Sequence, residues 1–167
     1  MDRTALLISG TVGAGKTTVA DALGDLLRAD GVPGAVLDVD WLRRAWPAPP
    51  GDRFNHHLTL RNLRAVAANL SGRIVLAGVI ESRADRDDYQ AALDAPLTVG
   101  RLRVDLTTVR ERLRRRHADD DEGLRWHLRR CGELDAILAA AAVEDFVIDG
   151  GGTIRQVANA MRTAAGW

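Results

Sequence analysis

Gly10-Thr11-Val12-Gly13-Ala14-Gly15-Lys16-Thr17 is the stretch of this sequence that decides the fold. It fits the pattern G-x-x-x-x-G-K-[ST] at every fixed position, a loop whose backbone N–H groups surround phosphate oxygens. Lys16 is the only lysine in the chain, and the remaining Lys+Arg total is all Arg. A compact ammonium reaches between the β- and γ-phosphates, where the wider guanidinium fork does not fit as well. The stretch therefore predicts a nucleoside triphosphate site.

The residues on both sides agree with such a loop, which must follow a buried strand and open a helix. The apolar run 5–8 predicts a strand over 5–9, and apolar residues at helical spacing predict a helix over 16–28. A chance glycine-rich turn is the alternative interpretation. In the phosphate-loop interpretation the Thr17 hydroxyl is a ligand of Mg²⁺, and Thr18 contacts a phosphate oxygen or caps the helix locally.

Short apolar runs alternate with helical stretches along the whole chain, which is typical of an α/β fold with a mostly parallel sheet. We therefore expect a P-loop NTPase fold: a small doubly wound sheet of five strands with helices on both faces. The predicted strands are 5–9, 35–39, 73–80, 102–106 and 146–148, and the predicted helices are 16–28, 57–70, 85–93, 108–116, 122–142 and 153–164. A length of 167 residues fits one domain over 1–167.

Composition excludes several other classes of protein. The formal net charge of +0 argues against a nucleic-acid or membrane-surface binder, because both need a standing positive field. The single cysteine, Cys131, rules out an internal disulfide framework and a cysteine-based zinc site. No leader and no long apolar stretch is evident, so we expect a cytoplasmic enzyme.

Two carboxylates follow the second predicted strand, in Leu37-Asp38-Val39-Asp40-Trp41-Leu42-Arg43. The carboxyl end of a parallel strand faces the ligand crevice, on the same side as the phosphate loop. Phosphoryl transfer to a hydroxyl needs a proton acceptor and a metal shell, and two acids could divide these tasks. The alternative is that Asp38 or Asp40 only caps the next helix.

These segments, together with Arg61-Asn62-Leu63-Arg64, resemble small-molecule P-loop kinases, especially adenylyl-sulfate kinases. Val39-Asp40-Trp41-Leu42 followed by Ala45-Trp46-Pro47 is also similar to chloramphenicol phosphotransferases. The resemblance implies that Asp40 is the catalytic base and that Asp38 serves the metal shell or the substrate. It places Arg43 at the acceptor.

The segment after the third strand both follows and departs from the adenylyl-sulfate kinase pattern. Arg83 and Arg86 resemble the Arg-rich turn that holds the acceptor in that family, although an ordinary solvated loop is the alternative. Val79 stands where the family has an aromatic residue, and no Ser-Pro follows Ile80. Phe54 could supply only one stacking face, so adenylyl sulfate is a doubtful acceptor. Glu81 is a candidate for the metal shell or the acceptor.

Five of the seven residues 110–116 are Arg, on a predicted helix. Such a run is usually a solvated face, but the resemblance places a mobile lid at about 107–130 whose Arg side chains close over the phosphates. We expect Arg116 to be catalytic and Arg112 to contact the nucleotide, with Arg129 a weaker candidate. Gly151 and Thr153, in the turn after the last strand, are expected beside the adenine. Thr153 is equally suited to cap the last helix.

The sequence thus predicts an ATP- and Mg²⁺-dependent phosphotransferase, acting on a hydroxyl of a small metabolite or antibiotic. Its predicted catalytic residues are Lys16, Asp38, Asp40 and Arg116, with Thr17 and Asp38 at the metal. The alternatives are a nucleotide, nucleoside or adenylyl-sulfate kinase, and an ATP-binding protein that sequesters its ligand unmodified. We expect a monomer or homodimer.

Overall fold

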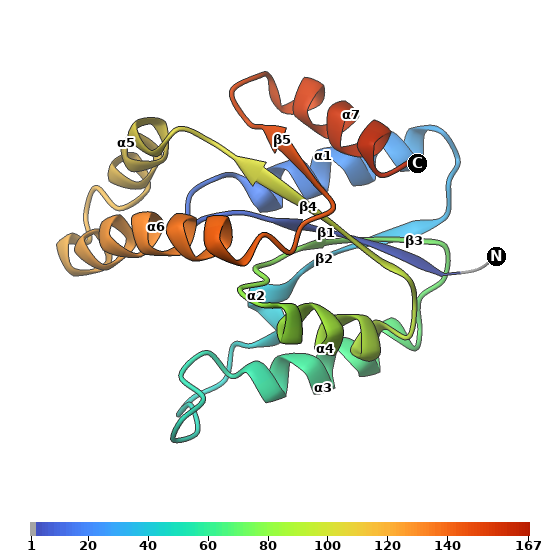
Figure 1. Ribbon diagram of the computed structural model, residues 1–167, viewed down its shortest axis with the longest axis horizontal. Helices are drawn as coiled ribbons and strands as arrows, with labels where there is room; N and C mark the ends of the chain where they lie inside the picture. The colour runs from blue at the N-terminus through green and yellow to red at the C-terminus, as the bar shows by residue number, and fades with distance from the viewer. Residues whose placement is uncertain (1–2) are drawn as a thin grey trace.

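The computed structural model describes residues 3–167, which form one sheet of five strands with helices around it (Figure 1). The strand order is β2-β3-β1-β4-β5, and all four neighbouring pairs are parallel. The strands are β1 (Thr4–Ser9), β2 (Gly34–Asp38), β3 (Arg73–Ala77), β4 (Leu97–Arg103) and β5 (Phe146–Asp149). The predicted α/β fold is confirmed, with a fully parallel sheet.

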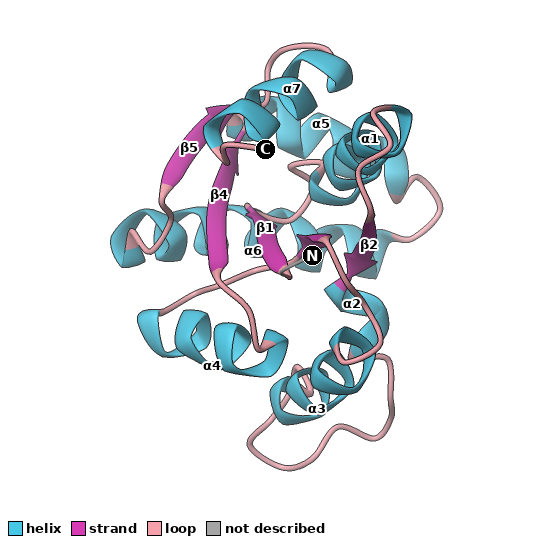
Figure 2. Ribbon diagram, turned by 90° about the vertical axis from the view of Figure 1, so that its right-hand side faces the viewer, coloured by secondary structure: helices cyan, strands magenta, loops and turns pink. Residues whose placement is uncertain are grey.

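Helices cover both faces of this sheet, as Figures 1 and 2 show. Helices α1 and α7 lie on one face, α3 and α4 lie on the other, and α5 and α6 lie toward the carboxyl ends of the strands. Each face has its own core of buried aliphatic side chains. The helices are α1 (Lys16–Ala29), α2 (Val39–Leu42), α3 (His56–Ala67), α4 (Arg83–Leu93), α5 (Leu106–Arg116), α6 (Asp121–Ala141) and α7 (Ile154–Ala164).

The fourth strand is the predicted strand whose position differs most, at 102–106 instead of Leu97–Arg103, and the short helix α2 was not predicted. The apolar pattern is broken by Arg101, which points into the protein and is only 6% exposed. Its guanidinium is neutralised by Asp135, at 2.9 Å, and by Glu144, at 3.7 Å. Both partners are distant in sequence. The local pattern over 97–103 therefore contains a charged residue with no visible partner, which argues against a buried strand.

The second strand ends one residue earlier than predicted, because Val39 begins the short helix α2. The third strand ends at Ala77 rather than at residue 80. The proline-containing segment between α2 and α3 contains no helix or strand and extends away from the sheet (Figure 1). These shorter elements leave the residues that follow β2 and β3 free to line one end of the sheet.

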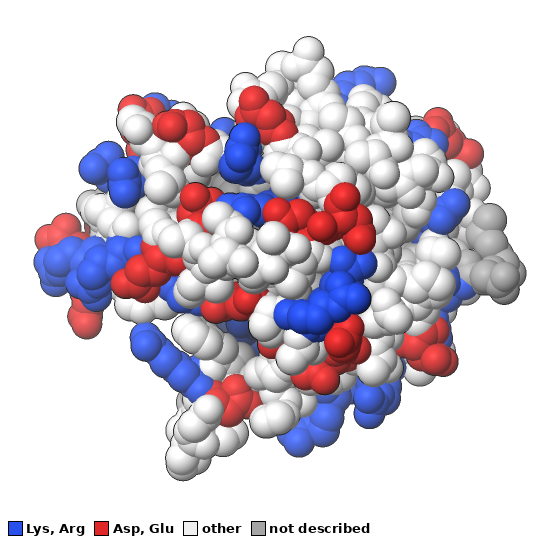
Figure 3. All heavy atoms as spheres, in the orientation of Figure 1, with Lys and Arg blue, Asp and Glu red and all other residues white. Residues whose placement is uncertain are grey.

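Positive and negative side chains are interspersed over the face in Figure 3, with Lys and Arg densest at the end where α5 meets α6. In agreement with the formal net charge of +0, the face in this view carries no single broad basic surface. Within residues 3–167, no helix has the combination of length and apolar composition that a membrane crossing requires.

Candidate active site

The loop between β1 and α1 has the backbone geometry of a phosphate cradle. Gly13 and Gly15 have φ values of 81° and 97°, in the left-handed region that favours glycine. Gly15 is the N-cap of α1, and no side chain caps this helix. Its first N–H groups and the positive end of its dipole are therefore available to an anion.

Lys16 is half-buried inside this loop. Its ammonium donates hydrogen bonds of 3.0 Å to the backbone carbonyls of Gly10 and Thr11. Burial lowers the pKa of Lys16 to about 8, while the nearby carboxylates of Asp40 and Asp38 act in the opposite direction. A bound phosphate would favour the charged ammonium, so this lysine is poised to gain from an anionic ligand.

Asp38 joins the phosphate loop to the end of β2. One carboxylate oxygen accepts a 2.8 Å hydrogen bond from the Thr17 hydroxyl, and the other accepts a 2.9 Å bond from the backbone N–H of Asp40. Asp38 therefore does cap α2, and the same side chain also reaches the loop. Capping is confirmed for Asp38, and its role at the metal or the substrate stays a prediction.

Asp40 lies in the first turn of α2, and its carboxylate is exposed. Its side chain is 76% exposed and lies 3.4 Å from Nε of Arg43. The Arg43 side chain is largely buried beside it. The pair gives the site an accessible carboxylate whose position is held by one neighbouring cation.

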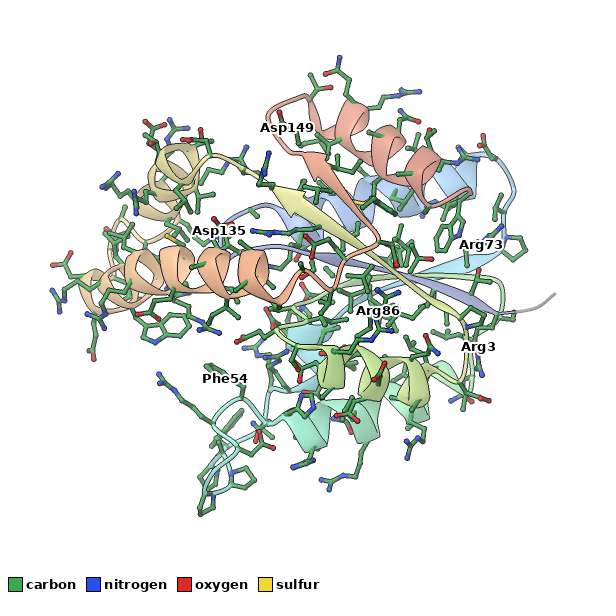
Figure 4. All side chains as sticks on the ribbon, viewed as in Figure 1. Arg3, Phe54, Arg73, Arg86, Asp135 and Asp149 are labelled. Carbon is green, nitrogen blue, oxygen red and sulfur yellow. The ribbon has the colours of Figure 1, made fainter. Side chains whose placement is uncertain are left out.

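A cavity of about 640 Å³ connects the phosphate loop with Asp40 and Arg43. Phe54 borders it from the segment before α3, and Figure 4 shows this residue below α6. Its ring lies 5.7 Å from the guanidinium of Arg130 on α6. The cavity therefore brings together residues from the amino-terminal half of the chain and from the segment predicted as a lid.

Sequence reasoning missed part of the cavity wall. Arg130 was not singled out, although it donates a 2.5 Å hydrogen bond to Glu81, the candidate acid after β3. Trp126 and His127 line the same cavity from α6, and the buried Tyr89 lines it from α4. A signal was available in the spacing of residues 126, 127, 130 and 134, which fall on neighbouring turns of one helix. What the sequence could not show is that this face turns toward the site.

The Arg-rich helix α5 packs directly on the phosphate loop. Arg112 donates a 3.2 Å hydrogen bond to the carbonyl of Ala14, and Leu113 packs so closely that a Cβ at Gly13 would lie 3.0 Å from it. Arg116 lines the cavity, whereas Arg129 is not among the residues that border it. The structure thus brings Arg112 and Arg116 to the site and leaves Arg129 outside.

Two predicted acceptor residues do not border the cavity. Arg86 donates to both carboxylate oxygens of Asp145, at 2.9 and 2.8 Å, and to the carbonyls of Val143 and Leu97. Figure 4 shows it between α4 and the chain above that helix. Arg83 is exposed and faces Asp87. Arg86 holds α4 to the chain before β5 and does not line the cavity, so its predicted place at the acceptor is wrong.

Gly151 and Thr153 also lie apart from the cavity. Their turn follows Asp149, which Figure 4 places on the opposite side of the molecule from Phe54. Thr153 caps α7 and forms a reciprocal capping box with Gln156. Capping is therefore confirmed for Thr153, and contact of this turn with a nucleotide base stays a prediction.

A phosphate loop after the central strand of an all-parallel sheet, with acids at the carboxyl end of a second strand, defines the class of P-loop nucleotide-binding proteins. Residues 2–116 match the family model described as adenylylsulphate kinase. The chain belongs to this family.

Individual relatives agree with the family match. Over 60 residues, 36% of this chain, it is 40% identical to a probable adenylyl-sulfate kinase of Aeropyrum pernix, and the match spans 32% of that relative's length. An APS kinase of Mycobacterium tuberculosis, solved in complex with AMPPNP and APS, superposes with a TM-score of 0.66 at 20% identity, covering 99% of both chains. A tunicamycin resistance protein of Deinococcus radiodurans gives 0.67 at 20% identity, covering 98% of this chain and 96% of that one. The two structures are similar to this chain in fold.

Proposed function

We propose that this protein is a small-molecule kinase, which transfers the γ-phosphoryl group of ATP to a hydroxyl of its acceptor. The observation that carries the proposal is that one cavity is lined by Lys16, Asp40 and Arg116. Phosphoryl transfer needs a cation on the phosphates, an acceptor for the hydroxyl proton and a cation for the charge of the transition state. These three side chains supply the three groups.

Mg²⁺ fits the oxygens at the loop. The Thr17 hydroxyl and the Asp38 carboxylate are hard oxygen donors only 2.8 Å apart. Among residues 3–167 no cluster of three or more acidic, His or Cys side chains is suited to a metal. This is the usual situation for Mg²⁺, which is bound by one or two protein oxygens, water and substrate phosphates. The ion would neutralise charge on the triphosphate.

Asp40 is the proposed base. Its carboxylate takes the proton of the acceptor hydroxyl while that oxygen bonds to the γ-phosphorus. The bond from the γ-phosphorus to the β–γ bridging oxygen breaks, and ADP leaves with the electron pair. Arg43 holds Asp40 in place, and Arg116 neutralises charge on the transferring group. Arg112 and the loop amides hold the nucleotide.

Replacement of Asp40 by Asn tests this function. We expect turnover to fall by roughly 10²-fold or more, because a positioned base contributes about 10²–10⁴-fold. Binding of MgAMPPNP, measured by titration calorimetry, should change little. Asp87→Asn is the matched control, since Asp87 is an exposed acid outside the cavity. Equal turnover in the Asp40 variant and the wild type would reject the assignment.

Because the chain matches the adenylylsulphate kinase family, adenylyl sulfate is one acceptor to test, alongside uncharged hydroxyl compounds. Mass spectrometry of each candidate acceptor after incubation with MgATP detects the added phosphoryl group directly. An acceptor that stays unmodified, yet raises the melting temperature of the protein, would favour sequestration over transfer. The cytoplasm as location, and a monomer or homodimer as assembly, stay predictions.

A further inference from the structure

Two of the guanidiniums in the wall at the acceptor end of the cavity, those of Arg130 and Arg43, are already held in ion pairs. Arg130 reaches across from α6 to Glu81, at 2.5 Å, and its side chain is only 17% exposed. Arg43 lies 3.4 Å from Asp40 at the other side of this wall. Each guanidinium therefore meets the cavity with a carboxylate already beside it.

The remaining charges do not reverse this balance. Asp52 and Asp85 also line the cavity: Asp52 accepts hydrogen bonds from two backbone N–H groups, and Asp85 accepts one from the N–H of Glu81. Arg53 is the other cation, 5.5 Å from the ring of Phe54. Leaving aside Lys16 and Arg116 for the triphosphate, the described wall carries three guanidiniums and four carboxylates: Arg43, Arg53, Arg130, and Asp40, Asp52, Glu81, Asp85.

An anionic acceptor would meet an unfavourable field in this arrangement. An anion that bound Arg130 would lie beside the carboxylate of Glu81, which already accepts a hydrogen bond from that guanidinium. The anion and the carboxylate of Glu81 would then repel each other, and this repulsion is stronger where water is partly excluded. Uncharged hydroxyl groups meet no such penalty, because carboxylate oxygens accept and guanidinium N–H groups donate hydrogen bonds to them.

We infer that Glu81 determines acceptor specificity: by neutralising Arg130 it excludes anionic acceptors and selects an uncharged, hydroxyl-bearing small molecule. The inference rests on the proposed function, because only a kinase has a phosphoryl acceptor. The effect of these charges on ligand binding can still be measured without any phosphoryl transfer. Phe54 and Trp126 give the same cavity apolar surface for the carbon skeleton of such a compound.

The test is calorimetric titration of protein saturated with MgAMPPNP, using adenylyl sulfate as the anionic probe and adenosine as the uncharged probe. We expect Glu81→Gln to bind adenylyl sulfate roughly 10- to 100-fold more tightly than the wild type, because a freed Arg130 gains a charge-assisted hydrogen bond. Adenosine binding should change little. The double variant Glu81→Gln/Arg130→Gln should lose the gain.

Asp25→Asn is the matched control, because it removes one negative charge from an exposed ion pair on α1. Thermal unfolding of each variant checks that it is folded. If Glu81→Gln binds adenylyl sulfate no more tightly than the wild type, the inference is wrong. It is also wrong if the wild type binds this anion tightly and Arg130→Gln alone weakens binding tenfold. Failure of phosphoryl transfer with these binding results intact would reject the proposed function instead.

Discussion

The hydroxyl of Thr17, in the first turn of α1, donates a 2.8 Å hydrogen bond to the carboxylate of Asp38, the last residue of β2. These residues are 21 positions apart in the chain. The contact links the phosphate loop to the end of the strand that precedes the proposed base, and it brings together the two oxygens that would hold Mg²⁺.

Weakening this pair should change the requirement for metal. Asp38→Asn keeps an oxygen that can accept from the N–H of Asp40, so α2 stays capped, but it removes the negative charge. We expect the Mg²⁺ concentration for half-maximal turnover to rise roughly 10- to 100-fold, and Thr17→Ala to act in the same direction. Magnesium titration of the steady-state rate measures this. An unchanged midpoint in both variants would place the metal elsewhere.

Lys16 should make nucleotide binding depend on pH. Its pKa, lowered by burial to about 8, lies below its ordinary value of 10.5, so as the pH rises the unliganded protein releases this proton before the unfolded chain does. Between these values the unfolded chain holds more protons, and stability of the unliganded protein rises with pH. Triphosphate favours the ammonium, so binding takes up a proton and weakens, by up to about tenfold per pH unit, as pH rises above about 8.

Calorimetry in two buffers of different ionisation enthalpy, at about pH 8.5, measures the proton uptake by Lys16. Lys16→Arg is the control, since a guanidinium stays charged throughout this range. The residual binding of that variant should show no buffer dependence. Identical enthalpies in both buffers for the wild type would contradict the assignment.

Arg116 should matter for turnover more than for binding. It lines the cavity, whereas its neighbour Arg115 does not. An Arg that stabilises the transferring phosphoryl group contributes about 10³-fold or more. We expect Arg116→Gln to lower kcat by roughly 10²–10³-fold and Arg115→Gln to lower it little. Comparing kcat and nucleotide affinity in the two variants decides whether position 116 acts on the transition state.

Arg86 should affect stability and leave the acceptor site intact. Its guanidinium donates hydrogen bonds to Asp145 and to two backbone carbonyls. Removing this largely buried guanidinium would leave those groups without a hydrogen-bond partner. We expect Arg86→Gln to lower the free energy of unfolding by about 2–3 kcal/mol, with KM for the acceptor unchanged. Urea denaturation and steady-state kinetics measure the two quantities. A raised KM at unchanged stability would restore the sequence-based role of Arg86.

Local patterns were enough for the loop and most elements. The chemistry of Gly13, Gly15 and Lys16 is specific to phosphate loops, because only that spacing combines a left-handed turn with a helix start and a cation. The hydrophobic periodicity predicted all major helices to within a few residues. It failed at β4, where the buried charge of Arg101 is satisfied by partners from distant parts of the chain.

The sequence by itself determined that this chain is an α/β protein with a phosphate loop after its first strand, and that acids follow its second strand. Only the tertiary structure decided which side chains share the cavity. In the folded protein Arg130 lines the cavity and pairs with Glu81, whereas Arg86 lies outside the cavity and pairs with Asp145. The physical reason is that the direction of a helix face, and the partner of each Arg, depend on packing between segments far apart in sequence. No local pattern records that packing.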